Sequence, residues 1–183
     1  MKLRTYIYVI LLSVSSLALA ERGSGGGYRS KYGFDFKAYK PNIQNGVGWI
    51  GGMRTGRYLG TSNVHVTLNG FYGTPTGQNP SDEFLYYGGL GLGYDFRMSK
   101  VFLAEFGIVV GYGQGKSSTL NVDKTSYYVI EPNFGMGFAL GNGWRLIFSA
   151  SYIHMTSVRE FSGATFGVRI DFQTETITRE VNH

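Results

Sequence analysis

The sequence is notable first for the residue types and segments that it lacks. The chain of 183 residues contains no cysteine, which excludes a disulfide framework, thiol catalysis and cysteine-ligated metal sites. It also has no basic run of the kind that suggests nucleic-acid binding. After the first twenty residues, no apolar run is long enough to form a membrane-spanning helix. Glycine, with 28 residues, and the aromatic residues, at 16%, are abundant instead.

The first twenty residues have the pattern of a secretory signal peptide. A basic start that includes Lys2 precedes an apolar run, and Ala18 and Ala20 fit the small-x-small cleavage rule. The run is shorter than the roughly 20 residues that a spanning helix needs, which favours cleavage over a membrane anchor. We therefore predict a signal peptide at 1–20 and a mature chain that begins at Glu21.

Apolar residues alternate with other residues in several segments of the mature chain. Trp144, Leu146 and Phe148 share one parity with Ala150 and Tyr152, and a period of two is the period of a β-strand. Charged residues, glycine and serine occupy much of the opposite parity. Strands of about ten residues with one apolar and one polar face are typical of outer-membrane barrels, which are apolar outside and polar inside.

Eight segments show this alternation, and short links alternate with longer ones between them. The expected strands are 31–40, 46–57, 63–72, 84–97, 101–113, 126–140, 144–156 and 161–173. Pro132 lies inside one of them, where a bulge is expected. We predict an all-β fold, an eight-stranded antiparallel up-and-down transmembrane β-barrel at 31–173. A flexible linker at 21–30 would precede it, and a short C-terminal tail at 174–183 would follow.

The inward positions hold most of the charged residues of these strands, six basic and five acidic. They are Lys31, Asp35, Lys37, Arg54, Asp95, Arg97, Glu105, Glu131, Arg145, Arg169 and Asp171. Eight strands enclose an interior only just wide enough for side chains. Because an unpaired charge there would cost several kcal/mol, the near balance predicts a salt-bridged plug. An ion or solute pathway is the alternative.

A second candidate site lies where the strand at 144–156 ends. His154 and Thr156 have the lipid-facing parity, and Glu160 and Ser162 would share it if the next strand keeps its parity. A histidine beside a hydroxyl, with a carboxylate nearby, is the composition of an acyl-hydrolysing site. An ordinary polar rim in the headgroup zone is the interpretation that we favour. No cofactor is expected, and no metal site, since histidine pairs at ligand spacing are missing.

The strand pattern, the turn at 140–144 and the ending at 167–172 resemble the small eight-stranded outer-membrane barrels of the OmpA/OmpX-like superfamily, over about residues 28–173. This resemblance implies a porin-like barrel in a Gram-negative outer membrane, inserted by the outer-membrane assembly machinery. His154-Met155-Thr156-Ser157 is also partly similar to the His-x-Ser-Asn motif of lipid A deacylases. The histidine matches, whereas Thr156 replaces the nucleophilic serine and Ser157 replaces the asparagine.

We therefore predict a non-enzymatic outer-membrane barrel with a structural or surface-interaction role. Its expected partners are outer-membrane lipid and lipopolysaccharide, with a candidate surface ligand at the external loops Gly73–Glu83 and Gln114–Thr125, and no nucleic acid. A lipid A-modifying acyl hydrolase with a rim site around His154 is the alternative. A soluble secreted β-protein is a third interpretation.

Overall fold

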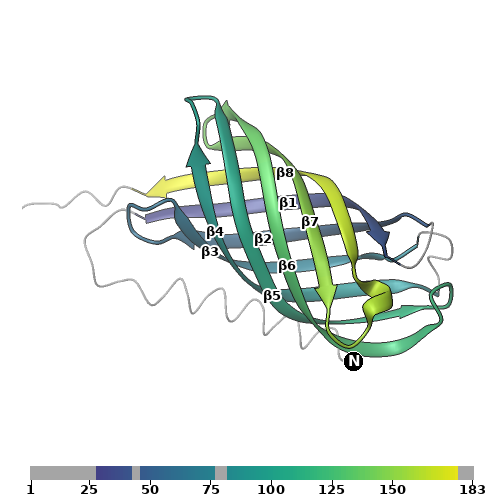
Figure 1. Cartoon of the computed structure of the whole chain (residues 1–183). Coiled ribbons are helices and arrows are strands. Elements are labelled where there is room, and N and C mark those ends of the chain that lie inside the picture. The colour runs from purple at the N-terminus through teal and green to yellow at the C-terminus, as the bar shows by residue number, and fades with distance from the viewer. Residues whose placement is uncertain (1–27, 43–45, 77–81, 177–183) are drawn as a thin grey trace, which may run out of the picture. The chain divides into compact units, whose positions relative to one another are not determined.

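The computed structural model describes residues 28–42, 46–76 and 82–176, and strands from these segments form one closed barrel (Figure 1). The strands are β1 (Tyr28–Pro41), β2 (Gly48–Tyr58), β3 (Val64–Thr74), β4 (Phe84–Arg97), β5 (Phe102–Ser117), β6 (Val122–Gly141), β7 (Trp144–Met155) and β8 (Gly163–Thr176). Each strand lies beside its neighbours in sequence order, and β8 closes the barrel against β1. The predicted fold class is confirmed. The predicted signal peptide, residues 21–27 of the linker and residues 177–183 of the tail lie outside the described residues.

A short 3₁₀-helix, η1 (Arg159–Phe161), is the one helical segment in the described part of the chain. No helix among these residues has the length and apolar character needed to cross a membrane.

The strand ends differ from the prediction at several places. β1 begins at Tyr28, inside the predicted linker, because Ser30 continues the ladder opposite Arg57 of β2. β8 begins after η1 and continues to Thr176, into the predicted tail. Pro132 causes no bulge: Ile130 and the residues after Pro132 keep one register with β7, and the ladder only lacks two pairs there.

The predicted long external loop at Gln114–Thr125 is instead an extended hairpin. β5 and β6 continue to Ser117 and Val122, so that only residues 118–121 form the turn. Inside this turn the backbone N–H of Leu120 donates to the Ser117 hydroxyl at 3.1 Å, and the Leu120 side chain is buried. The burial of the Leu120 side chain and its backbone hydrogen bond to Ser117 stabilise a tight turn. The two strands therefore extend beyond their predicted ends.

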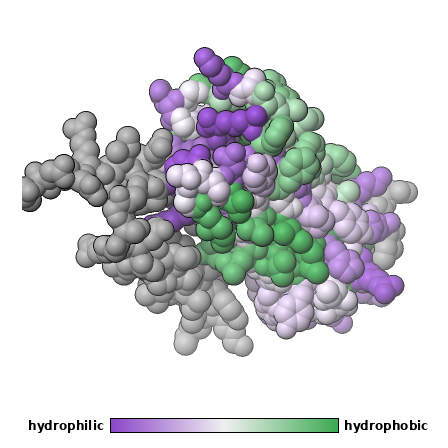
Figure 2. All heavy atoms as spheres, turned by 60° about the vertical axis from the view of Figure 1, so that its left-hand side comes forward, coloured by the Kyte–Doolittle hydropathy of each residue, from purple (hydrophilic) through white to green (hydrophobic). Residues whose placement is uncertain are grey.

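The outward faces of the strands form an apolar belt. Phe34 and Phe166 are each 66% exposed, and Tyr128 is 65% exposed. Figure 2 shows hydrophobic side chains gathered between hydrophilic patches on one face of the molecule. A contiguous apolar surface of this kind needs lipid rather than water around it.

The two ends of the barrel differ in their links. β1 begins and β8 ends at the end that carries the turns at 59–63, 98–101 and 142–143. The opposite end carries the links at 42–47, 75–83, 118–121 and 156–162. In outer-membrane barrels short turns face the periplasm and longer loops face outward. We refer to them as the periplasmic end and the external end.

Candidate functional site

Ten charged side chains of the strands are buried in the lumen, five cations and five anions. They are Lys31, Lys37, Arg54, Arg145 and Arg169, with Asp35, Asp95, Glu105, Glu131 and Asp171. Arg97, which the sequence placed in this set, is exposed, because it is the last residue of β4 and lies beyond the enclosed part of the lumen. Without Arg97 the buried charges balance, which reduces the energetic cost of burying them.

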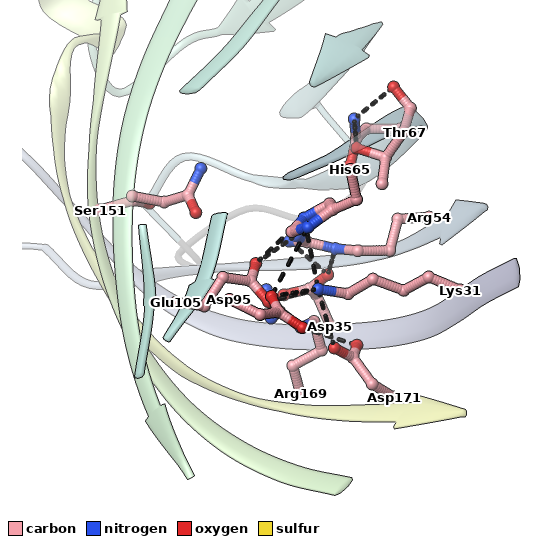
Figure 3. A network of polar contacts seen from close by, with 12 residues as sticks. Lys31, Asp35, Arg54, His65, Thr67, Asp95, Glu105, Ser151, Arg169 and Asp171 are labelled. Atoms are coloured by element: carbon pink, nitrogen blue, oxygen red, sulfur yellow. Dashed lines mark hydrogen bonds and ion pairs between the residues drawn. The ribbon is translucent and has the colours of Figure 1, made fainter. Parts of the chain in front are cut away.

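Glu105 of β5 lies at the centre of the charged network (Figure 3). Its carboxylate accepts hydrogen bonds from Lys31 and, at 2.5 Å, from Arg169. Arg54 Nη1 lies 3.5 Å from the other carboxylate oxygen. Three strands therefore direct cations at one carboxylate, and none of these groups is exposed to solvent.

The remaining acidic side chains each lie close to a cation, and two of these cations, Arg54 and Arg169, are shared with Glu105. The closest pairs are Asp35 with Arg54 at 2.9 Å, Asp95 with Arg145 at 2.5 Å, Glu131 with Lys37 at 2.5 Å and Asp171 with Arg169 at 2.7 Å. The Asp95–Arg145 pair joins β4 to β7, and the Glu131–Lys37 pair joins β6 to β1, across the lumen. Such pairing makes the network a cross-link between strands that are distant in sequence.

His65, Asp95 and Glu105 have the composition of a metal site, and their ligand atoms lie within 4.8 Å of one another. Lys31 Nζ lies among them, 3.3 Å from His65 Nε2 and 3.3 Å from an Asp95 oxygen, and it also donates to Glu105. The ammonium group supplies the positive charge that a metal ion would supply. The arrangement is therefore an ion-pair cluster around Lys31.

A polar cluster crosses the lumen at its periplasmic end. The Tyr58 hydroxyl donates to Asp95 at 2.5 Å, and Arg145 donates to Gln173 at 2.5 Å. The Arg29 guanidinium lies over the Tyr58 ring, 4.4 Å from its centroid. These side chains come from β1, β2, β4, β7 and β8, so they join opposite walls of the barrel.

The external half of the lumen is filled by an apolar and aromatic cluster that the sequence analysis missed. Its members are Tyr39, Ile50, Phe71, Leu85, Tyr87, Leu120, Tyr127, Val129, Ile153, Met155, Val158 and Phe161. The pattern that could have revealed it is the run of residues with apolar character in both parities, as at 84–87 and 127–130. Both of these runs lie near the external end, where the inward face is apolar as well as the outward one.

A small cavity lies beside the charged side chains of the lumen. A cavity beside Arg54, His65 and Glu105 has a volume of about 10 Å³, which is room for about one water molecule. At the boundary between the charged network and the aromatic cluster, Glu131 accepts hydrogen bonds from Tyr87 at 2.8 Å and from Ser151 at 2.6 Å.

The rim residues proposed for acyl hydrolysis are not brought together. His154 and Thr156 are exposed, as expected for the outward parity. The prediction that Ser162 faces lipid is wrong, because Ser162 is buried and its hydroxyl accepts the Met155 N–H at 3.0 Å. Glu160 lies in η1, which interrupts the strand whose parity the prediction assumed. Within the described residues, no hydrogen bond joins His154 to a hydroxyl or a carboxylate.

A buried carboxylate outside the strands connects two external links. Glu83 accepts hydrogen bonds from Thr76, from Ser117 at 2.8 Å and from the Thr119 N–H at 3.2 Å. Burial raises the pKa of the Glu83 carboxyl, but these hydrogen bonds outweigh burial and hold the pKa below its ordinary value. The negative charge of Glu83 is therefore part of the structure at the external end.

Comparison with known proteins finds similarity in structure. No family model matches the chain, and no curated protein sequence matches it. The N-terminal β-barrel domain of Pseudomonas aeruginosa OprF is similar with a TM-score of 0.61 and 11% identity, covering 80% of this chain and 97% of that one. Neisserial surface protein A has a TM-score of 0.59 and 12% identity, covering 80% and 98%. Ail of Yersinia pestis has a TM-score of 0.53 and 14% identity, covering 82% and 100%.

These three structures agree with the closed barrel of this chain. Identities this low establish the fold alone. The predicted resemblance to small eight-stranded barrels is confirmed at that level. The chain is therefore an outer-membrane-type β-barrel, with the fold of the small eight-stranded outer-membrane proteins.

Proposed function

We propose that this chain is a non-enzymatic integral outer-membrane protein with a plugged lumen, which interacts with its surroundings through the external end. The observation that carries the proposal is the filling of the lumen. A balanced charged network occupies one half and an aromatic cluster the other, and the cavity between the strands beside Glu105 measures only about 10 Å³.

Conductance across a planar bilayer tests the plugged lumen. The refolded protein is expected to insert and to produce no steady ion current, because the buried charged side chains and the aromatic cluster occupy an interior that eight strands make only just wide enough for side chains. A matrix porin measured in the same bilayer is the positive control. Reproducible single-channel steps from the refolded protein would contradict the proposal.

The external end is the part of the barrel that we assign to interaction with lipopolysaccharide or a surface ligand. Lys40, Lys124 and Arg159 are exposed there, and Lys116 is half-buried. Ail, whose barrel is similar, has been solved in complex with the heparin analogue sucrose octasulfate. Cations at the external ends of β1, β5 and β6 and on η1 suit a phosphorylated or sulfated sugar. Membrane insertion by the outer-membrane assembly machinery belongs to the same proposal.

The rival function, lipid A acyl hydrolysis, depends on His154. Because no hydroxyl or carboxylate of the described residues is hydrogen-bonded to its ring, we expect His154→Ala to leave the lipid A acylation profile unchanged. Mass spectrometry of lipid A from cells that express the wild-type protein, the variant or neither provides the measurement. An acyl chain that is lost with the wild-type protein and retained with the variant would establish the enzyme.

A further inference from the structure

A cationic pocket opens at the periplasmic end of the barrel, beside the β4–β5 turn. Its volume is about 50 Å³, and its polar lining includes Arg97, Lys100, Arg145 and Ser99. None of the described residues that line it is acidic. The shape and the excess of positive charge suit a compact anionic group.

Two of the three cations are free to bind such a group. Arg145 is neutralised by Asp95, which lies 2.5 Å away. Arg97 and Lys100 are exposed, and within the described part of the chain neither forms an ion pair. Because Arg97 follows Asp95 in the inward parity, its side chain extends from the lumen wall toward the mouth.

The pocket adjoins the apolar belt. Val101 and Phe102 line it together with the cations. Val101 is exposed, and the Phe102 ring contacts Phe138 on the outer face at a centroid distance of 5.5 Å. Trp144 and Phe172 form a second ring pair at the same end, 4.8 Å apart. Aromatic girdles of this kind lie at the level of the lipid headgroups.

We infer that this pocket binds the phosphate group of an anionic phospholipid of the periplasmic leaflet. Arg97 and Lys100 would contact the phosphate, and the acyl chains would lie along Phe102 and Phe138. A bidentate guanidinium and an ammonium are the side chains best suited to a phosphate oxygen pair. The inference goes beyond the proposed function, since it concerns the opposite end of the barrel and does not depend on whether the lumen conducts.

Native mass spectrometry of the refolded protein in a nonionic detergent, with phosphatidylglycerol and phosphatidylcholine added, tests the site. Replacing both free cations, Arg97→Gln with Lys100→Gln, is expected to lower the apparent affinity for phosphatidylglycerol about tenfold. The matched control, Arg29→Gln with Arg57→Gln, removes the same charge from the same end of the barrel but away from the pocket, and it should change the affinity for phosphatidylglycerol little. Equal retention by all three proteins would overturn the inference, and so would equal losses in both double variants.

Two further experiments test whether the bound anion is a lipid headgroup and whether it binds at this pocket. Inorganic phosphate in excess should leave the phosphatidylglycerol bound; complete displacement would indicate a free-anion site and contradict a lipid ligand. The chain has 2 tryptophans, so Trp49→Phe leaves Trp144, which precedes the lining residue Arg145 at the start of β7, as the reporter. Brominated phosphatidylglycerol in phosphatidylcholine vesicles should quench Trp144 selectively, and the double variant should lose this selectivity. If brominated phosphatidylglycerol quenched Trp49 with the same selectivity in a Trp144→Phe protein, binding at the periplasmic-end pocket would be contradicted.

Discussion

At the residue scale, Glu105 is the side chain on which most of the buried charge network depends. It faces Lys31, Arg54 and Arg169, and all four groups are buried. Glu105→Gln leaves five buried cations facing four anions, so we expect the free energy of unfolding to fall by about 3–5 kcal/mol. Urea titration in detergent micelles, followed by tryptophan fluorescence, measures the change.

A double-mutant cycle separates this charge effect from a general loss of packing. Lys31→Met restores the charge balance when it is combined with Glu105→Gln. The double variant is then expected to be less destabilised than the sum of the two single variants, by about 1–3 kcal/mol. Additive losses would show that Lys31 and Glu105 act independently.

Glu83 gives the external end a dependence on pH. Its folded pKa lies below the ordinary value of 4.5, so its contribution to stability is fully present above pH 4.5 and is lost as the pH falls through the folded pKa. Glu83→Gln should therefore reduce the loss of stability on acidification below pH 4.5. The protection of the Thr119 amide against hydrogen exchange, followed as a function of pH, measures this loss of stability at the external end. The exposed neighbour Asp82 provides the control Asp82→Asn, and an identical profile in both variants would exclude this role for Glu83.

At the scale of elements, the β6–β7 turn requires a left-handed backbone. Gly141, Asn142 and Gly143 have φ values of 92°, 51° and 82°. A Cβ at Gly143 would also lie 2.2 Å from the Gln173 carbonyl oxygen of β8, whereas one at Gly141 would have nothing within 4 Å. We expect Gly141→Ala to cost about 1 kcal/mol and Gly143→Ala at least about 2 kcal/mol. Equal unfolding midpoints in urea would contradict the steric explanation.

The elements also show how far parity predicts the site. Strand order and the inward parity of Lys31, Glu105 and Asp171 follow from the period of two, because that period assigns each residue to a face. The prediction of burial failed for Arg97, the last residue of β4, and the prediction of a lipid-facing position failed for Ser162, which lies between η1 and β8. The alternation of faces does not show at which residue a strand leaves the barrel. It also does not show where a helical turn such as η1 precedes the next strand, β8.

At the scale of the whole molecule, the closed ladder predicts resistance to detergent. Every strand has a partner on both sides, so no edge strand is exposed along the barrel. The unboiled protein in SDS should therefore migrate faster than the boiled protein, and the fast form should be found in the outer-membrane fraction. Identical mobility before and after boiling, together with a soluble protein, would mean that the apolar faces pack against one another instead.

The sequence by itself determined the barrel, because eight segments of period two can satisfy their backbone in lipid only by pairing into a closed sheet. It also determined which charges face inward. The tertiary structure alone decided which of these charges pair, since partners such as Lys31 and Glu105 are 74 residues apart and come from different strands. It likewise decided that the external half of the lumen is apolar. That outcome depends on how the strands are staggered, and a staggered register is a property of the closed sheet rather than of any one strand.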